Sequence, residues 1–105
     1  MSGARWYIRR RASPEKTTQT ACRTLLRLRH IPFWDTSQPR AALVTAGLPD
    51  LLLFAPRLIF VEVKSPTGRL SPTQRVFQRL CATAGVPYWV VRSAAELAAA
   101  LDAAP

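Results

Sequence analysis

Two carboxylates and one lysine are the residues of this 105-residue chain whose types and spacing could do chemistry. Glu62 and Lys64 lie two positions apart in the apolar segment 58–64, which predicts a β-strand, and alternation along a strand puts both on one face. Asp50 begins the preceding predicted strand, 49–55. An antiparallel hairpin would bring the start of the first strand beside the end of the second. The three side chains are therefore expected to lie close together.

A divalent cation is the partner that this arrangement predicts. Two neighbouring carboxylates repel each other unless a cation lies between them. Mg²⁺, with Mn²⁺ as a substitute, suits the site because it binds a few carboxylates and keeps waters and phosphate oxygens as its other ligands. Such an ion would polarise a phosphodiester and lower the pKa of a bound water. Lys64 would orient that water and offset developing charge, and the number of ions stays open.

Each of these residues also has a simpler interpretation. A Glu-x-Lys pair is commonly a salt bridge on an exposed strand, although the strand that carries Glu62 and Lys64 is apolar on both faces, which disfavours a merely solvated pair. Pro49-Asp50 alone is a routine turn at a strand entry. Glu15, which could complete the site directly or through water, is also an ordinary acid in the first turn of a helix.

The elements that must position these residues begin with a helix. Ser13-Pro14-Glu15 has the composition of a helix start, and the helix is predicted to run to about Arg29. Counting back by helical steps places Glu15 and Gln19 on or beside its buried face. A short edge strand at 31–34 and an irregular loop at 35–47 follow. The apolar residues that define the buried face are Ala21, Cys22, Leu25 and Leu26.

A second helix is predicted after the strand that ends in Lys64. Ser71 and Gln74 form a capping-box pattern at its start, and Gly85 ends it. Arg75 and Arg79 are expected to point outward. The predicted buried stripe of this helix consists of Val76, Phe77, Leu80, Cys81 and Ala84.

The remaining segments complete an α/β fold. A tight turn at Pro56-Arg57 joins the two central strands, a further strand is expected at 88–91, and a last helix runs from Ser93 to about Leu101. The order α-β-β-β-α-β-α predicts a mixed sheet flanked by helices. Residues 1–12 are interpreted as a basic N-terminal arm, and 13–105 as a single domain.

The charge balance favours a polyanionic partner. Fifteen basic residues oppose six acids, which gives a net charge of +9 and a pI near 11.3. Nucleic acid is preferred over a membrane surface, since no basic amphipathic helix with bulky aromatics is evident and no apolar stretch could cross a bilayer. The alternative is that arginine richness reflects a GC-rich genome.

The cysteines and the N-terminal residues indicate in which cellular compartment the protein is located. Cys22 and Cys81 stand apart in apolar contexts without the spacing of a zinc site or a disulfide framework. No apolar core of a secretory signal is seen near Met1. A cytoplasmic location, in a bacterium or a phage-infected host, is expected.

Three motifs in order resemble a known family. Gly47-Leu48-Pro49-Asp50, Val61-Glu62-Val63-Lys64 and Ser71-Pro72-Thr73-Gln74 resemble the PD-(D/E)xK nuclease signature in its VRR-NUC (virus-type replication-repair nuclease) form. The run from Lys64 to Phe77 resembles that family's lysine–loop–glutamine segment, and Val90-Val91-Arg92-Ser93 the following strand and turn. The likeness covers roughly 13–101. One departure is that Thr17 and Thr18 replace the apolar residues usual around the first-helix glutamate and glutamine.

The resemblance implies an α-β-β-β-α-β nuclease core, extended here by a C-terminal helix, and metal-dependent hydrolysis of phosphodiester bonds. The catalytic residues it indicates are Asp50, Glu62, Lys64 and Gln74, and the metal ligands are Glu15, Asp50, Glu62 and Val63. Candidate DNA contacts are Arg9, Arg10, Arg11, Arg69, Arg75 and Arg79.

Small stand-alone members of the family, often phage-encoded, resemble homodimeric nucleases that cut DNA junctions. The expected substrate is therefore branched DNA such as four-way (Holliday) junctions, cut by a homodimer whose twofold symmetry supplies two active sites. Two alternatives stay open at this point. One is a nuclease acting on linear or flap DNA, and the other is a basic nucleic-acid-binding module without chemistry.

Overall fold

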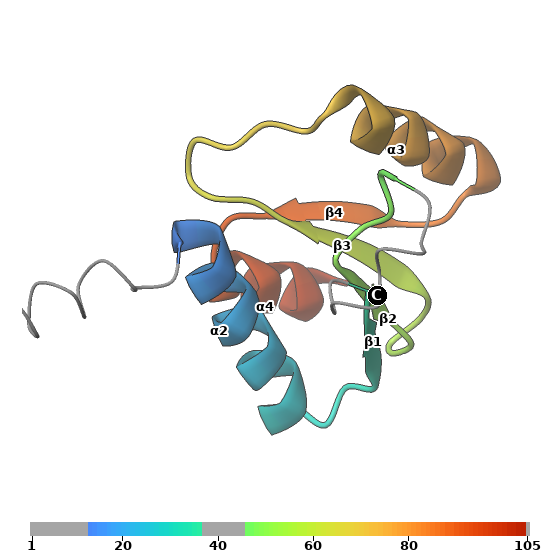
Figure 1. Ribbon diagram of the computed structural model, residues 1–105. Helices are drawn as coiled ribbons and strands as arrows, with labels where there is room; N and C mark the ends of the chain where they lie inside the picture. Colours follow the sequence, from blue (N-terminus) through green and yellow to red (C-terminus); the bar gives the residue numbers. More distant parts are fainter. Residues whose placement is uncertain (1–12, 37–45, 105) are drawn as a thin grey trace, which may run out of the picture.

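The computed structural model describes residues 13–36 and 46–104, and these form one mixed sheet with helices on both sides (Figure 1). In chain order the elements are α2 (Pro14–Leu28), β1 (Phe33–Asp35), β2 (Leu51–Leu53), β3 (Ile59–Val63), α3 (Pro72–Ala84), β4 (Tyr88–Val91) and α4 (Ala94–Ala103). The order and the mixed sheet confirm the α/β prediction. The predicted arm at 1–12, and 37–45 of the predicted loop, lie outside the described residues.

The sheet has the strand order β1-β2-β3-β4. β1, β2 and β3 form antiparallel pairs, whereas β4 pairs with β3 in parallel after the crossover through α3. Leu51 lies opposite Val61, so the preceding Asp50 comes beside Glu62. The structure thus confirms the predicted pairing, in which the start of the first hairpin strand lies beside the end of the second.

The central strands are shorter than predicted. Instead of 49–55 and 58–64, they span Leu51–Leu53 and Ile59–Val63, and residues 54–58 form the connection in place of a tight turn at Pro56-Arg57. Pro49 and Pro56 have no backbone N–H to offer to the ladder, which accounts for the early ends.

The hydrophobic core lies between the sheet and the pair of helices α2 and α4. Cys22 and Leu26 of α2 and Leu97 of α4 are fully buried there, while Ala21, predicted on the same face, is exposed. The strand residues that complete this core are Leu51, Leu53, Ile59, Val61, Val63 and Val91. Burying each such side chain stabilises the fold by about 1.5–3 kcal/mol, so this side of the sheet carries most of the packing energy.

Among the described helices, α3 is the one that covers the opposite side of the sheet. Phe77 packs edge-on against Phe60 of β3, with ring centroids 5.0 Å apart, and lies near Tyr88 of β4. The predicted buried stripe was wrong for Val76 and Leu80, which are 47% and 61% exposed, and for Ala84. The reason is that α3 touches the sheet along a single line, and no other described element packs against its flank.

The ends of α3 follow the predicted signals. The Ser71 side chain accepts a hydrogen bond from the Gln74 backbone, and the Gln74 side chain accepts one from the Ser71 backbone, which is a complete capping box. Gly85 ends the helix in the left-handed conformation, with φ of 73°. Within the described part of the chain, no helix is both long and apolar enough to cross a membrane.

Candidate active site

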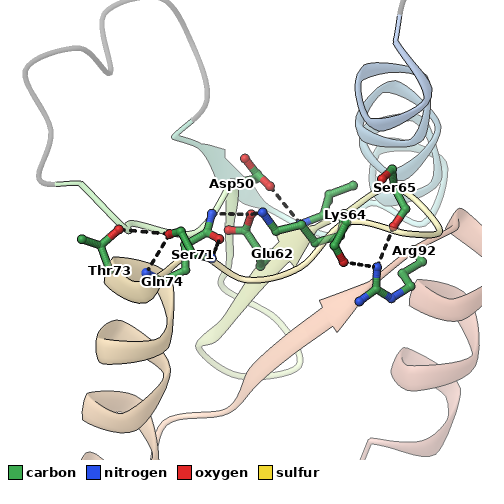
Figure 2. A network of polar contacts seen from close by, with 10 residues as sticks. Asp50, Glu62, Lys64, Ser65, Ser71, Thr73, Gln74 and Arg92 are labelled. Carbon is green, nitrogen blue, oxygen red and sulfur yellow. Dashed lines mark hydrogen bonds and ion pairs between the residues drawn. The ribbon is translucent and has the colours of Figure 1, made fainter.

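Asp50 and Glu62 form a carboxylate pair at the end of the β2–β3 hairpin (Figure 2). Glu62 is 2% exposed, on the α3 side of the sheet. Asp50 Oδ2 accepts a hydrogen bond of 2.8 Å from the backbone N–H of Val63. This bond fixes the Asp50 side chain against the strand that carries Glu62, so the pair is held by backbone geometry.

Lys64 and Gln74 both approach the same oxygen of Glu62. The ammonium nitrogen of Lys64 lies 3.7 Å from Glu62 Oε2, and Gln74 Nε2 donates to that oxygen at 3.0 Å. Gln74 Oε1 meanwhile accepts from the Ser71 backbone N–H at 2.8 Å. The structure therefore brings together the four residues predicted as catalytic, and Gln74 serves the helix cap and the site at once.

Burial dominates the electrostatics of the pair. It raises the pKa of Glu62 from its ordinary 4.5 to about 8; the Asp50 carboxylate adds to the rise, and Lys64 opposes it. Burial likewise raises the pKa of Asp50, against the lowering effect of hydrogen bonds with the Val63 backbone, Glu62 and Gln19. Two adjacent buried carboxyls titrate as a unit, so the pair retains a proton near neutral pH.

The donor set of the pair fits a hard divalent cation. Glu62 Oε1 is buried and meets no N–H or hydroxyl donor among the described residues, so only a proton shared with the adjacent Asp50 carboxyl could reach it, while Oε2 is occupied by Lys64 and Gln74. An unpaired buried carboxylate oxygen is costly unless a proton or a cation compensates it. Asp50 beside it supplies a second oxygen ligand of the kind that Mg²⁺ and Mn²⁺ prefer. The residues present thus fit the expected ion.

The other predicted ligands occupy less direct positions. Glu15, in the first turn of α2, is half-buried and its charge contributes to the raised pKa of Glu62, after the larger effects of burial, Asp50 and Lys64. Gln19, one turn further along, reaches Asp50. Within residues 13–36 and 46–104 no three Asp, Glu, His or Cys side chains gather closely enough to hold a metal by themselves. Val63 faces the core, so only its backbone can contribute to the site.

Asp50 is also positioned by two contacts that sequence reasoning missed. The Thr36 backbone N–H donates to the carbonyl of Asp50 at 2.9 Å, and the Thr36 hydroxyl donates to the carbonyl of Pro49. Gly47 has φ of 92° and approaches helix α3 so closely that a Cβ there would lie 2.6 Å from the Thr73 carbonyl oxygen. The glycine of the Gly47–Asp50 motif is therefore needed for the segment to dock on the first turn of α3.

Lys64 is held by the loop that follows it. Arg92, at the end of β4, donates from Nη1 to the carbonyl oxygens of Ser65 and Gly68, at 2.6 and 2.7 Å (Figure 2). Gly68 in turn lies against the stem of Lys64, since a Cβ on it would be 3.5 Å from Lys64 Cδ. Arg92 thus acts on the lysine through the loop. No local sequence pattern predicts such a contact, because it joins an arginine to backbone carbonyls that are distant in the sequence.

Replacing Arg92 by alanine is expected to loosen Lys64 and to lower the free energy of unfolding by about 2 kcal/mol, because two hydrogen bonds from a charged donor are lost. Lys16 and Lys64 are the two lysines of the chain, so lysine-selective ¹³C labelling gives one reference signal and one site signal. The Cε signal of Lys64 should shift towards that of the exposed Lys16. A folded variant in which the Lys64 signal does not move would contradict the positioning role.

Three of the six arginines predicted to contact DNA lie among the described residues. Arg69, Arg75 and Arg79 are all exposed, with Arg69 on the loop after Lys64 and the other two on α3. Their positions agree with outward-pointing side chains. Arg9, Arg10 and Arg11 lie outside the described residues.

Comparison with known proteins places the whole arrangement in a family. The VRR-NUC domain model matches residues 41–95, which include Asp50, Glu62, Lys64 and Gln74. A solved structure described as a VRR_NUC domain has a TM-score of 0.73 at 23% identity, covering 90% of this chain and 100% of that chain, and it shows the same fold. No curated protein sequence matches. Because the matched segment makes up more than half of the 105 residues, this protein belongs to the VRR-NUC family of nuclease domains.

Proposed function

We propose that the protein is an endonuclease that hydrolyses phosphodiester bonds in DNA with the help of Mg²⁺ or Mn²⁺. The observation that carries this proposal is the buried Asp50–Glu62 pair, with one glutamate oxygen that meets no N–H or hydroxyl donor among the described residues and Lys64 3.7 Å from the other. A structural salt bridge to Lys64 needs one carboxylate, whereas here a second carboxylate, that of Asp50, lies beside the buried Glu62. Membership of a nuclease family supports the same conclusion.

Each residue of the site has a distinct task in this proposal. Asp50 and Glu62 hold the cation, with Glu15 and the Val63 backbone as further candidate ligands. The chemistry that the cation supplies when bound is polarisation of the phosphodiester and acidification of a water molecule. Lys64 offers its ammonium to the attacking water and to the charge that develops on the phosphate. Gln74 keeps Glu62 in place through the bond to Oε2.

Branched DNA, with four-way junctions as the leading case, is the proposed substrate, and a twofold dimer is the proposed assembly. Cutting a junction symmetrically needs two active sites that face the two continuous strands, and a twofold axis provides them. The net charge of +9 suits a substrate that concentrates phosphates.

A nicking assay on linear, flapped and four-way DNA, in Mg²⁺, Mn²⁺ and EDTA, tests the proposal. Replacing Lys64 by alanine should reduce the cleavage rate by about 100- to 1,000-fold and leave DNA affinity nearly unchanged. Lys16→Ala is the matched control, because Lys16 is the other lysine of the chain and is exposed. The control should cut at the wild-type rate.

Three outcomes of this assay separate the alternatives. Preference for four-way DNA supports a junction-cutting enzyme, whereas equal cutting of linear or flapped DNA supports a less selective nuclease. If wild-type protein binds DNA but cuts none of these substrates in either metal, the chain is a binding module and the proposal fails.

A further inference from the structure

Five of the six large apolar side chains that are most exposed in the described chain lie on the α3 side of the molecule. Three of them, Trp34, Phe54 and Leu58, belong to the first three strands or the turn between β2 and β3, and they are 66%, 48% and 44% exposed. The other two, Val76 and Leu80, belong to α3 itself. Exposed apolar surface concentrated on one side of a small domain marks an interaction site.

Cross-strand register shows that the strand residues form one continuous surface. Trp34 lies directly opposite Leu52, and Phe54 and Leu58 directly follow and precede the last paired residues of β2 and β3, Leu53 and Ile59. Trp34 and Leu52 point to the face that carries Glu62, because side chains alternate along the paired strands, and Phe54 and Leu58 are the next residues in that alternation at the two ends of the connection. We call Trp34, Leu52, Phe54 and Leu58 the apolar strip.

The apolar strip is open because α3 covers only the other half of this face. Phe77 packs on Phe60 of β3 and Tyr88 of β4, and the main contact of α3 with the sheet is to β4. The strip also begins at the carboxylate pair. Asp50, Leu52 and Phe54 succeed one another on the same face of β2, so at about 3.3 Å per residue the strip extends roughly 13 Å from Asp50.

The chain that carries the strip is strongly basic, with a net charge of +9. A cleft of about 560 Å³ at the β1 edge is lined by Trp34 and also by Arg27 and Asp35, but Arg27 lies over the ring of Phe33, which faces the α2 side of the sheet. Arg57 is exposed in the turn between Phe54 and Leu58. Asp35, the acid of β1, points to the other face of the sheet and pairs with Arg23 at 3.2 Å. A polyanion is therefore favoured over a second copy of this basic chain.

We propose that the apolar strip binds unpaired nucleotides of the DNA substrate next to the bond that is cut. The proposal rests on the proposed function, since it takes the scissile phosphate to lie at Asp50 and Glu62. Nucleotides that flank this phosphate, spaced at about 3.4 Å when stacked, would lie over the strip. Only an unpaired base can offer its face to Trp34 and Phe54, because the bases of a duplex are stacked on each other. Among the branched DNAs proposed above, this favours those with an unpaired segment at the cleavage point, such as flaps, or junctions whose bases unstack at the branch point, over a fully paired four-way junction.

Equilibrium binding in EDTA tests this inference without any cleavage. The probes are a dye-labelled blunt duplex and the same duplex carrying a single-stranded thymidine tail, titrated with the full chain. Trp34→Ala should weaken binding of the tailed duplex by about tenfold, the typical loss for one stacking side chain, and change binding of the blunt duplex by less than about twofold. Trp34→Phe should retain most of the affinity, and Phe54→Ala should repeat the selective loss.

Leu28→Ala is the matched control, since Leu28 is 73% exposed and lies on α2 across the sheet. The inference would be overturned if Trp34→Ala lost affinity equally for the blunt and the tailed duplex. It would also be overturned if Leu28→Ala lost as much affinity for the tailed duplex as Trp34→Ala. So would a Trp34→Ala protein that sediments as a monomer where the wild type is a dimer, because the strip would then be a protein interface. If the wild type cuts no DNA but Trp34→Ala still loses tailed-duplex affinity, the proposed function fails and the binding surface stands.

Discussion

Replacement of Glu62 by glutamine is expected to abolish cleavage and, at the same time, to stabilise the metal-free protein at pH 8. Cleavage should be lost because the amide removes one of the two carboxylates proposed to hold the cation. Stability rises because the wild type must bury a group that prefers to be neutral there: burial and Asp50 raise the pKa of Glu62 to about 8, with Lys64 opposing. At many active sites, a residue that is needed for activity lowers the stability of the folded protein.

The sign of the pH dependence follows from that raised pKa. Below the ordinary value of 4.5 both the folded and the unfolded chain hold the proton, and the stabilising contribution is fully present. Between pH 4.5 and about 8 the unfolded chain releases the proton while the folded chain keeps it, so stability falls as pH rises. Each pKa unit of difference corresponds to about 1.4 kcal/mol. The Glu62→Gln variant lacks this slope.

Thermal unfolding in EDTA between pH 4.5 and 8.5, with a parallel cleavage assay, measures both effects. Asp102→Asn is the control, because Asp102 is an exposed carboxylate paired with Arg29 at the far end of α4 and should leave the slope and the activity intact. Addition of Mg²⁺ at pH 8 should raise the melting temperature of the wild type and not of Glu62→Gln. A Glu62→Gln protein that still cuts DNA, or one that is less stable at pH 8, would refute this account of the site.

Replacement of Gly47 by alanine is the second change with a large expected effect, a loss of roughly 3 kcal/mol in the free energy of unfolding. About 1 kcal/mol comes from forcing a side chain into a backbone conformation with φ of 92°. The remainder comes from the contact with Thr73, whose carbonyl oxygen would lie 2.6 Å from the new Cβ. Because that oxygen belongs to backbone, the segment leading to Asp50 must move away from α3, and divalent-cation affinity should fall as well.

Gly85→Ala separates these two contributions. Gly85 also has a positive φ, of 73°, but a Cβ there would meet nothing within 4 Å. Its replacement should therefore cost only about 1 kcal/mol and leave cation affinity unchanged. Urea unfolding of both variants, with Mn²⁺ titrations, gives the comparison. Equal destabilisation of the two would show that Gly47 is needed for its conformation alone and that the Thr73 contact is unimportant.

The carboxylate pair was predictable because it depends only on local rules. Alternation along a strand puts Glu62 and Lys64 on one face, and an antiparallel hairpin brings Asp50 to them whatever the details of the turn. The order of elements was predictable for a similar reason, since Ser13, Ser71 and Gly85 mark helix ends in the sequence. The spacing of Ser71 and Gln74 predicted the capping box, whereas the place of Gln74 in the site was expected from the family resemblance alone.

The remaining features depend on contacts between distant parts of the chain. The apolar residues of α3 predicted a buried stripe, but periodicity cannot say how much of a helix another element will cover, and Val76 and Leu80 are exposed. The contacts of Thr36 with Pro49 and Asp50, and of Arg92 with the loop after Lys64, join segments whose proximity only the folded sheet creates. The residues that hold the site in place were therefore harder to find than the residues of the site.

The chemistry of the amide explains why glutamine, and not glutamate, stands at position 74. A capping box accepts either residue, since both offer an oxygen to the Ser71 N–H. Only the amide also presents hydrogens on its other terminus, and it turns these towards Glu62 Oε2 at 3.0 Å. A glutamate at this position would place a second negative charge beside the Glu62 carboxylate, and the two would repel each other. One planar group with an accepting end and a donating end therefore ties the start of a helix to an acid on a strand.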